Sequence, residues 1–338
     1  MNNLKNKIEN MRFMRLFNFL KLILSIEKTD LDNLFKFINV LRNLRTNYHI
    51  NDFSNIHEIY LQTNWNQRNI NNLVNTSFST LSNNTQRKVL RLNEYKVYSQ
   101  NGEDGLILFL LSKIENLSKT FIDIGCGGKT SNSLNLVLNY GYSGLYIDGD
   151  LESINETKMK LEKCNNISQN CVAFSNTWIT KENVNKIIYD YKISNPNMDD
   201  LDLISIDVDG VDYWIFEALD LIKPKIVVIE YNASFGKELS VTVPYDERFD
   251  AINHHPRKWY HGASLMALKN IGKIKGYSLI GCDSNGVNAI LLRDDVIPND
   301  LSEINVEDAY YEHFQRSKIM TLSEQISYLI NNYSLFEI

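Results

Sequence analysis

Residues 121–128 read FIDIGCGG and are followed by TSNSLNL at residues 130–136. The apolar run predicts a strand, the glycines predict a tight turn, and the next segment predicts a helix. Glycines at such a junction let the backbone approach a ligand closely, and a helix start offers unpaired N–H groups. The stretch therefore predicts a cofactor site, and an ordinary strand-to-helix turn is the alternative. Asp123 favours a cationic or amine-bearing ligand over a phosphate.

Apolar runs and helical segments alternate beyond Tyr98. The runs are typical of strands buried on both faces of a sheet. The last two are joined by Asp283-Ser284-Asn285-Gly286, a hairpin turn. We expect an α/β fold with a Rossmann-like, doubly wound, mainly parallel seven-stranded sheet and an antiparallel final hairpin. The expected strands are 120–124, 144–148, 171–174, 201–207, 225–231, 278–282 and 287–293, and the expected helices between the earlier strands are 131–140, 153–164, 181–191 and 213–221.

The N-terminal part of the chain has a different composition. No glycine precedes Gly102, so residues 1–93 are expected to form an all-helical N-terminal region for docking or oligomerisation. Residues 12–26 predict an amphipathic helix that either packs on another helix or subunit, as in a homo-oligomer, or contacts a membrane surface. We expect residues 94–338 to form the second domain, with a substrate insertion at about 233–264 and a helical tail from about 299.

Overall composition narrows the class of protein. The chain has 338 residues and a net charge of −6 with interspersed signs, so we expect no nucleic-acid partner. We expect neither a membrane span nor a secretion signal, because no run of about 18 apolar residues and no cleavage site occurs. The four cysteines have no zinc or redox spacing, so reduced thiols and a cytoplasmic location are expected: Cys126, Cys164, Cys171 and Cys282.

Candidate cofactor-binding residues lie at the ends of the expected strands, where ligands bind in open α/β sheets. Asp148 follows the glycine loop by roughly twenty residues, the spacing of a ribose-binding acid. Thr130 stands where a dinucleotide fingerprint needs a third glycine, so a nucleoside cofactor without a pyrophosphate fits better. Residues 98–105 either cover that ligand or cap a helix, and Phe174 contacts either a purine or the core. The candidates are Gln100, Asn101, Glu103, Asp123, Gly125, Gly127, Asp148, Gly149, Phe174 and Ser175.

Acidic side chains end the fourth and fifth expected strands. Alternation along a strand predicts Asp207 and Asp209 on the same side. With Glu230 they can bind a hard divalent cation such as Mg²⁺, or one of them can act as a general base. The alternative for Asp209 is to cap the following helix. Asp212 is expected to face solvent or to cap that helix.

The histidines at 254–261 lie within the predicted insertion. We interpret this insertion as a substrate-recognition segment in which His261 is a candidate base. The candidate catalytic residues are Asp207, Asp209 and His261, and the candidate substrate residues are Glu230, Asn232, Tyr245 and Arg248. No histidine spacing typical of a metal site and no G-x-S-x-G motif occurs.

Several of these stretches resemble class I S-adenosylmethionine-dependent methyltransferases, and among them the FkbM-like group. They are YSQNGEDG at 98–105, DIGCG at 123–127, LYIDGD at 145–150, SIDVDG at 205–210 and IEYN at 229–232. Asp209 stands where that group usually has glutamate. The likeness covers about residues 94–293.

The resemblance implies methyl transfer from S-adenosylmethionine to a hydroxyl, with Asp123 and Gly125 beside the cofactor's amino-acid part and Asp148 on its ribose. It implies a sugar hydroxyl as acceptor, on a sugar nucleotide or glycan in surface polysaccharide biosynthesis. Two alternatives stay open, a non-catalytic partner in a glycan-assembly complex and a methyltransferase for a non-sugar metabolite. Thr130 disfavours a nicotinamide-dependent reductase. On this reading, Asp123→Ala should abolish cofactor binding and leave the fold intact.

Overall fold

The computed structural model describes residues 86–162, 171–195, 198 and 200–338. The chain divides into two compact units, Met1–Thr80 and Leu81–Ile338, and the description below concerns the second. The predicted helices before residue 86, including the amphipathic one at 12–26, lie outside the described residues, as does Cys164. The other three cysteines are free thiols. Among the described helices, none has the length and apolar character needed to cross a membrane.

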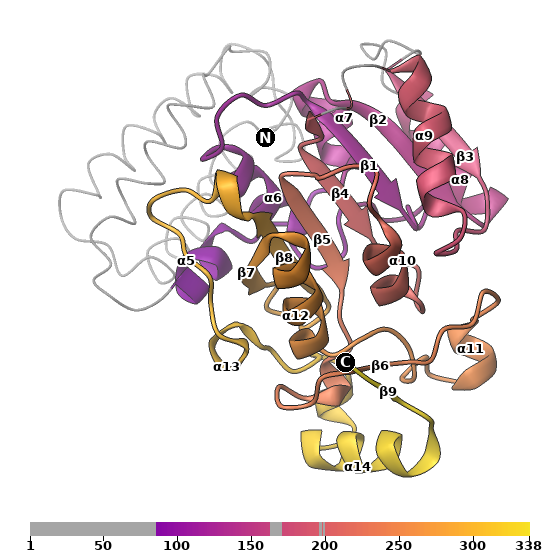
Figure 1. The fold of residues 1–338 in the computed structure, drawn as a ribbon, viewed down its shortest axis with the longest axis vertical. Coiled ribbons are helices and arrows are strands. Elements are labelled where there is room, and N and C mark those ends of the chain that lie inside the picture. The colour runs from indigo at the N-terminus through magenta and orange to yellow at the C-terminus, as the bar shows by residue number, and fades with distance from the viewer. Residues whose placement is uncertain (1–85, 163–170, 196–197, 199) are drawn as a thin grey trace, which may run out of the picture. The chain divides into compact units, whose positions relative to one another are not determined.

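A seven-stranded sheet forms the centre of this unit (Figure 1), in the order β3-β2-β1-β4-β5-β8-β7. Strands β1 to β5 are parallel, and β8 is antiparallel to both of its neighbours. The predicted Rossmann-like, mainly parallel sheet with an antiparallel final hairpin is confirmed, and each predicted strand end lies within two residues of the observed one. The strands are β1 Thr120–Ile124, β2 Ser143–Asp148, β3 Val172–Asn176, β4 Leu203–Ile206, β5 Ile226–Glu230, β7 Tyr277–Cys282 and β8 Asn288–Arg293.

Helices cover both faces of the sheet, which makes the fold doubly wound. Neighbouring strand residues such as Phe121 and Ile122 belong to two different buried clusters, because successive strand side chains point to opposite faces. The helices of one cluster are α5 Gln86–Asn93, α6 Glu103–Leu111, α7 Leu134–Tyr140 and α8 Leu151–Glu162, and those of the other are α9 Val184–Ser194, α10 Asp212–Ala218 and α12 Leu265–Lys275.

Helix α5 falls within the predicted N-terminal region but contacts α6 and β7. Its Leu90 is buried in the core of the second unit. Residues 86–93 therefore pack as part of the α/β unit.

The C-terminal tail is less helical than predicted. It contains α13 Val306–Ala309, the short 3₁₀ turn η5 Arg316–Lys318 and α14 Leu322–Asn332, and a further 3₁₀ turn, η4 Asp294–Val296, precedes it. Its last strand, β9 Phe336–Glu337, pairs with β6 Val241–Thr242 in a second small sheet. Tertiary contacts hold the irregular parts in place, as where the Tyr310 hydroxyl donates to the backbone oxygen of Ala233, 2.6 Å away. The segment at 233–264 contains η3 Ala233–Phe235, β6 and α11 Ala251–His254.

Candidate functional site

A cavity of about 990 Å³ lies at the carboxyl ends of β1, β2, β4 and β5. Strand order reverses between β1 and β4, the place where ligands bind in open α/β sheets. Many of the candidate residues from the sequence line this cavity together: Gln100, Glu103, Asp123, Gly125, Gly127, Asp148, Gly149, Asp207, Asp209, Glu230 and His261.

The glycine loop after β1 is fixed between two neighbouring strands. The Gly125 N–H donates to the backbone oxygen of Ile147, 2.8 Å away. Gly125 has a φ of 78°, and a Cβ there would lie 1.6 Å from the backbone oxygen of Asp207. Only glycine allows this close approach of the loop to the end of β4.

Asp148, at the end of β2, is half-buried and supports the same loop. Its Oδ2 accepts from the Gly127 N–H at 3.1 Å, and its Oδ1 accepts from the Asp150 N–H at 2.8 Å. A carboxylate has about four lone-pair sites. Oδ2 also accepts from the Cys126 thiol at 3.7 Å, so Oδ1 is the oxygen that keeps a lone pair for a ligand hydroxyl.

Asp123 is buried and fixes the start of α7. Its Oδ2 accepts from the hydroxyls of Ser131 at 2.8 Å and Ser133 at 2.6 Å. Burial raises the pKa of Asp123 to about 6, although these two hydrogen bonds oppose the rise. Asp123 therefore has a structural role that the sequence did not indicate.

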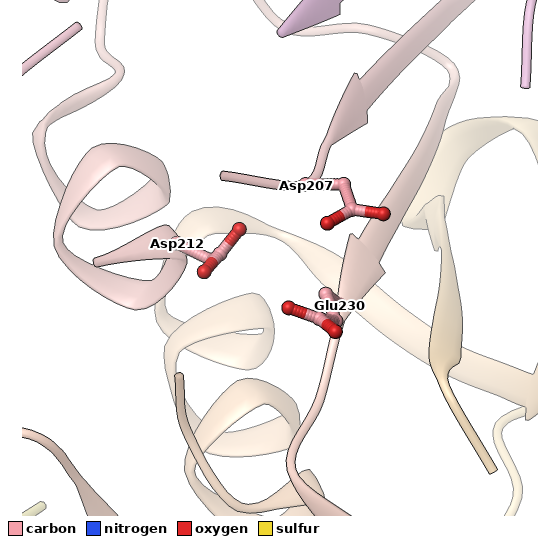
Figure 2. A group of neighbouring side chains, drawn as sticks. All are labelled: Asp207, Asp212 and Glu230. Carbon is pink, nitrogen blue, oxygen red and sulfur yellow. The ribbon is translucent and has the colours of Figure 1, made fainter. Parts of the chain in front are cut away.

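Three carboxylates converge beside the loop (Figure 2): Asp207, Asp212 and Glu230 each offer one oxygen, and these oxygens lie within 4.8 Å of one another. Asp212 is fully buried and accepts from the N–H groups of Val208 at 2.8 Å and Gly210 at 3.0 Å. Asp212 thus holds the turn before α10 and does not face solvent. The cap expected from Asp209 does not form: the N-cap of α10 is Val211, which makes no side-chain cap hydrogen bond.

The other two carboxylates lack such donors. Within the part of the chain that the structure describes, no group donates a hydrogen bond to the side chain of Asp207 or Glu230. Burial, and then the charge of Glu230, raises the pKa of Asp207 well above its usual range. Burial, and then the charge of Asp209, does the same to the pKa of Glu230. Glu230 Oε2 is therefore a buried carboxylate oxygen without a hydrogen-bond donor among the described residues.

Asp209 does not share the orientation of Asp207. Strand β4 ends at Ile206, and Asp209 has a left-handed φ of 56°. Its exposed side chain forms an ion pair with Lys258, with Oδ2 and Nζ 2.6 Å apart. The strand alternation on which the prediction rested therefore does not extend to residue 209, and Asp212 replaces Asp209 in the group of converging carboxylates.

His261 is buried and held from both sides. Arg316 Nη2 lies 2.8 Å from His261 Nε2, and because an arginine only donates, Nε2 is the acceptor and Nδ1 carries the proton. Nδ1 lies 3.2 Å from Glu230 Oε2, without the alignment of a hydrogen bond. Burial, and then the charge of Arg316, lowers the pKa of His261 to about 3. Its lone pair is occupied, so the geometry does not support His261 as the base.

Six candidate residues do not line the cavity: Asn101, Phe174, Ser175, Asn232, Tyr245 and Arg248. Phe174 stacks on Tyr146 in the core, with ring centroids 5.5 Å apart. Ser175 shares a hydrogen bond with the Thr177 hydroxyl at 2.9 Å. The core alternative for Phe174 therefore fits the structure, and a purine contact does not.

The remaining four are occupied by neighbours. The amide of Asn101 donates to Glu103, and the amide of buried Asn232 donates to the backbone oxygens of Trp259 and His261. The Tyr245 hydroxyl donates to Glu182, and exposed Arg248 lies 3.7 Å from Glu247. These contacts lie outside the cavity lining.

The lining also includes Trp178, Lys258 and Arg316, which were not among the candidate site residues. Trp178 lies two residues after β3 and is 54% exposed, so its place after an expected strand was the available signal. Arg316 lies 84 residues beyond Asn232 and yet donates to its Oδ1 at 2.7 Å. No local pattern signals such a contact.

Comparison with known proteins gives weak similarities only. No family model matches the chain, and no curated protein matches it. Among solved structures, PKMT2 from Rickettsia typhi, also determined in complex with AdoHcy, is similar at 12% identity and a TM-score of 0.38, over 61% of this chain and 56% of that chain.

Two further structures are similar at the same level. An O-methyltransferase family protein from Burkholderia thailandensis has 14% identity and a TM-score of 0.33, over 56% of this chain and 57% of that one. A Corynebacterium glutamicum protein has 13% identity and a TM-score of 0.36, over 67% of this chain and 96% of its own. The chain thus spans little more than half the length of the Rickettsia and Burkholderia proteins. Similarities this low carry no conclusion about activity.

Proposed function

We propose that the protein is an S-adenosylmethionine-dependent O-methyltransferase that acts on a sugar hydroxyl, on a sugar nucleotide or glycan in surface polysaccharide biosynthesis. One observation carries the proposal. A single cavity joins a glycine loop and the half-buried acid Asp148 to the carboxylates of Asp207 and Glu230, which accept no hydrogen bond from the described residues. The glycine loop and Asp148 suit a nucleoside, and the carboxylates of Asp207 and Glu230 suit a reacting hydroxyl.

The residues present fit the cofactor. Asp148 Oδ1 keeps a lone pair for a ribose hydroxyl, and the exposed indole of Trp178 offers a flat surface for a purine. The basic residues that line the cavity come from other segments than the glycine loop: Arg257, Lys258 and Arg316. The one cation of the glycine loop, Lys129, does not line the cavity, so the cavity side of this loop, beside the buried acid Asp123, suits a ligand without a pyrophosphate.

S-adenosylmethionine, when bound, supplies a methyl group attached to a positively charged sulfur. Asp207 is the residue placed to receive the proton that the acceptor hydroxyl loses, because its carboxylate faces the cavity without a donor and its pKa is raised. Glu230 and the Asp209–Lys258 pair then orient the acceptor. Much of the rate enhancement in such a reaction comes from positioning.

The acceptor proposal has support of its own. Arg257 is exposed beside the cavity and Lys258 is next to it, so two cations can meet the phosphates of a sugar nucleotide. The tests below also distinguish two alternatives. One is a non-sugar metabolite as acceptor, and the other is a role as a non-catalytic partner in glycan assembly.

Calorimetry with S-adenosylhomocysteine tests the cofactor site. We expect the wild type to bind and Asp148→Asn to lose at least about tenfold in affinity, because a hydrogen bond to a charged group contributes about 1.5–3 kcal/mol. Glu152→Gln, which changes an exposed acid outside the cavity lining, is the matched control and should bind as the wild type does. Absence of binding by the wild type, or binding of NAD in its place, would refute the proposal.

Mass spectrometry of surface glycans from cells with and without the gene tests the acceptor. Loss of one methylene mass per acceptor site is expected. An unchanged glycan together with a working cofactor site would exclude this acceptor and favour a small metabolite.

A further inference from the structure

The three converging carboxylates come from parts of the chain that the fold brings together. Asp207 follows β4, Asp212 begins α10 and Glu230 ends β5. In Figure 2 their carboxylates point toward a common space. Carboxylates this close repel one another unless a cation or a proton lies between them.

The structure supplies little compensation at this place. Glu230 is 8% exposed, its Oε2 has no hydrogen-bond partner among the described residues, and no described donor reaches Asp207. Lys258 and Arg316 are the nearby cations, but Lys258 pairs with Asp209 and Arg316 donates to neutral acceptors. Among the described residues, neither cation forms an ion pair with Asp207, Asp212 or Glu230.

We propose that Asp207, Asp212 and Glu230 bind one hard divalent cation, of the Mg²⁺, Mn²⁺ or Ca²⁺ type. The site itself does not rest on the proposed methyl transfer. Oxygen ligands favour these ions over zinc. His261 does not add a nitrogen ligand, because Nε2 accepts from Arg316 and Nδ1 carries the proton.

Asp212 can join the site without leaving its structural role. Its two oxygens each accept one backbone N–H, and a carboxylate has further lone pairs. These hydrogen bonds fix its orientation, as outer-shell partners do for metal ligands. Asp207 and Glu230 line the cavity, so water or a ligand hydroxyl can complete the coordination from that side.

The test uses the full-length chain stripped with EDTA and titrated with Mg²⁺, Mn²⁺ and Ca²⁺. We expect calorimetry to show one ion per chain and the ion to raise Tm. Glu230→Gln and Asp207→Asn should each weaken the affinity at least about tenfold. Asp209→Asn removes a carboxylate that pairs with Lys258 and is not a proposed ligand, so its loss should stay below about threefold.

The variant Glu230→Gln also guards against a simple folding defect. It keeps the side-chain shape and removes one of the uncompensated charges, so the EDTA-treated variant should have a Tm at or above that of the wild type, without any increase on adding the ion. Wild type that binds none of the three ions, or a Glu230→Gln variant that binds them as the wild type does, would overturn the proposal. A stripped wild type that is stabilised by lower pH and by no ion would show that a shared proton holds the carboxylates. Binding of S-adenosylhomocysteine to the EDTA-treated wild type is measured in parallel. If it binds and none of the three ions does, the cation site is refuted and the proposed function is not.

Discussion

Arg316 connects the C-terminal tail to the cavity through buried hydrogen bonds. Its guanidinium donates to Asn232 Oδ1 at 2.7 Å, to Ser234 Oγ at 3.1 Å and to His261 Nε2 at 2.8 Å. Burial lowers its pKa to about 10, against the charge of Glu230, which raises it. One side chain therefore fixes the amide of Asn232 and the tautomer of His261.

Removal of this side chain tests its role. Arg316→Ala leaves buried acceptors without donors, and we expect the free energy of unfolding to fall by at least about 3 kcal/mol. Urea denaturation measures the loss. Lys318→Ala is the control, because the ammonium of the exposed Lys318 lies 3.8 Å from the centre of the Phe314 ring and its removal should cost less than about 1 kcal/mol. Equal losses for the two variants would contradict the assigned role.

The neighbours of Asp123 in the structure change how a substitution at this residue is interpreted. The sequence predicts that Asp123→Ala abolishes cofactor binding and leaves the fold intact. The structure shows that the Ser131 and Ser133 hydroxyls donate to this carboxylate. Its removal takes the shared acceptor from two buried hydroxyls, so loss of binding by this variant would not by itself identify a ligand contact.

At the scale of the element, the turn after β1 depends on one close approach. Gly125 and Gly141 have similar left-handed φ values of 78° and 70°. A Cβ on Gly125 would collide with the backbone of Asp207, whereas a Cβ on Gly141 would meet nothing within 4 Å. A substitution at Gly141 therefore tests backbone strain alone, whereas a substitution at Gly125 adds a steric clash.

Alanine at the two positions makes this separation measurable. Gly141→Ala should lower the free energy of unfolding by about 1–2 kcal/mol, the cost of a left-handed conformation. Gly125→Ala should cost at least about 2 kcal/mol more, because β1 or β4 must also shift. Thermal and urea unfolding give both values. A Gly125→Ala variant as stable as Gly141→Ala would show that the loop tolerates the extra carbon.

At the scale of the whole molecule, buried acids make stability depend on pH. Burial, and then the charge of Glu103 on α6, raises the pKa of Asp283 from 3.8 to about 8. Asp283 lies in the β7–β8 turn and accepts from the N–H groups of Asn285, Val287 and Asn288. The folded chain therefore keeps a proton on Asp283 that the unfolded chain releases at lower pH.

The sign of the effect follows from this difference. A raised folded pKa stabilises the protein at low pH, and the stabilisation is lost as pH rises toward about 8. Below pH 6.5 the neutral buried histidines His261 and His313, whose pKa values are lowered to about 3 and about 4, oppose the trend. The expected window is therefore pH 6.5 to 8, where the free energy of unfolding should fall by up to about 1.4 kcal/mol per pH unit for this group.

Urea denaturation of EDTA-treated protein at pH 6.5, 7.2 and 8 checks the prediction. Asp283→Asn cannot release the proton, so its slope against pH should be smaller than that of the wild type, whatever its absolute stability. Identical slopes would show that Asp283 titrates normally in the folded protein.

The sequence by itself determined the sheet. The strands are continuous apolar runs bounded by polar turns, and their ends were predicted within two residues because burial on both faces leaves a local signal. It also determined that Asp123, Asp148, Asp207 and Glu230 would meet, since the carboxyl ends of parallel strands share one edge of the sheet.

Only the tertiary structure decided which of the neighbouring acids converge. Asp212 joins Asp207 and Glu230, whereas the left-handed backbone at Asp209 turns its side chain to Lys258. The contacts of Arg316 and the occupied lone pair of His261 likewise join segments far apart in the chain. The physical reason is one of range: strand periodicity and turn chemistry act over a few residues, whereas hydrogen bonds and charges in a cavity depend on which distant segments the fold brings within about 3 Å.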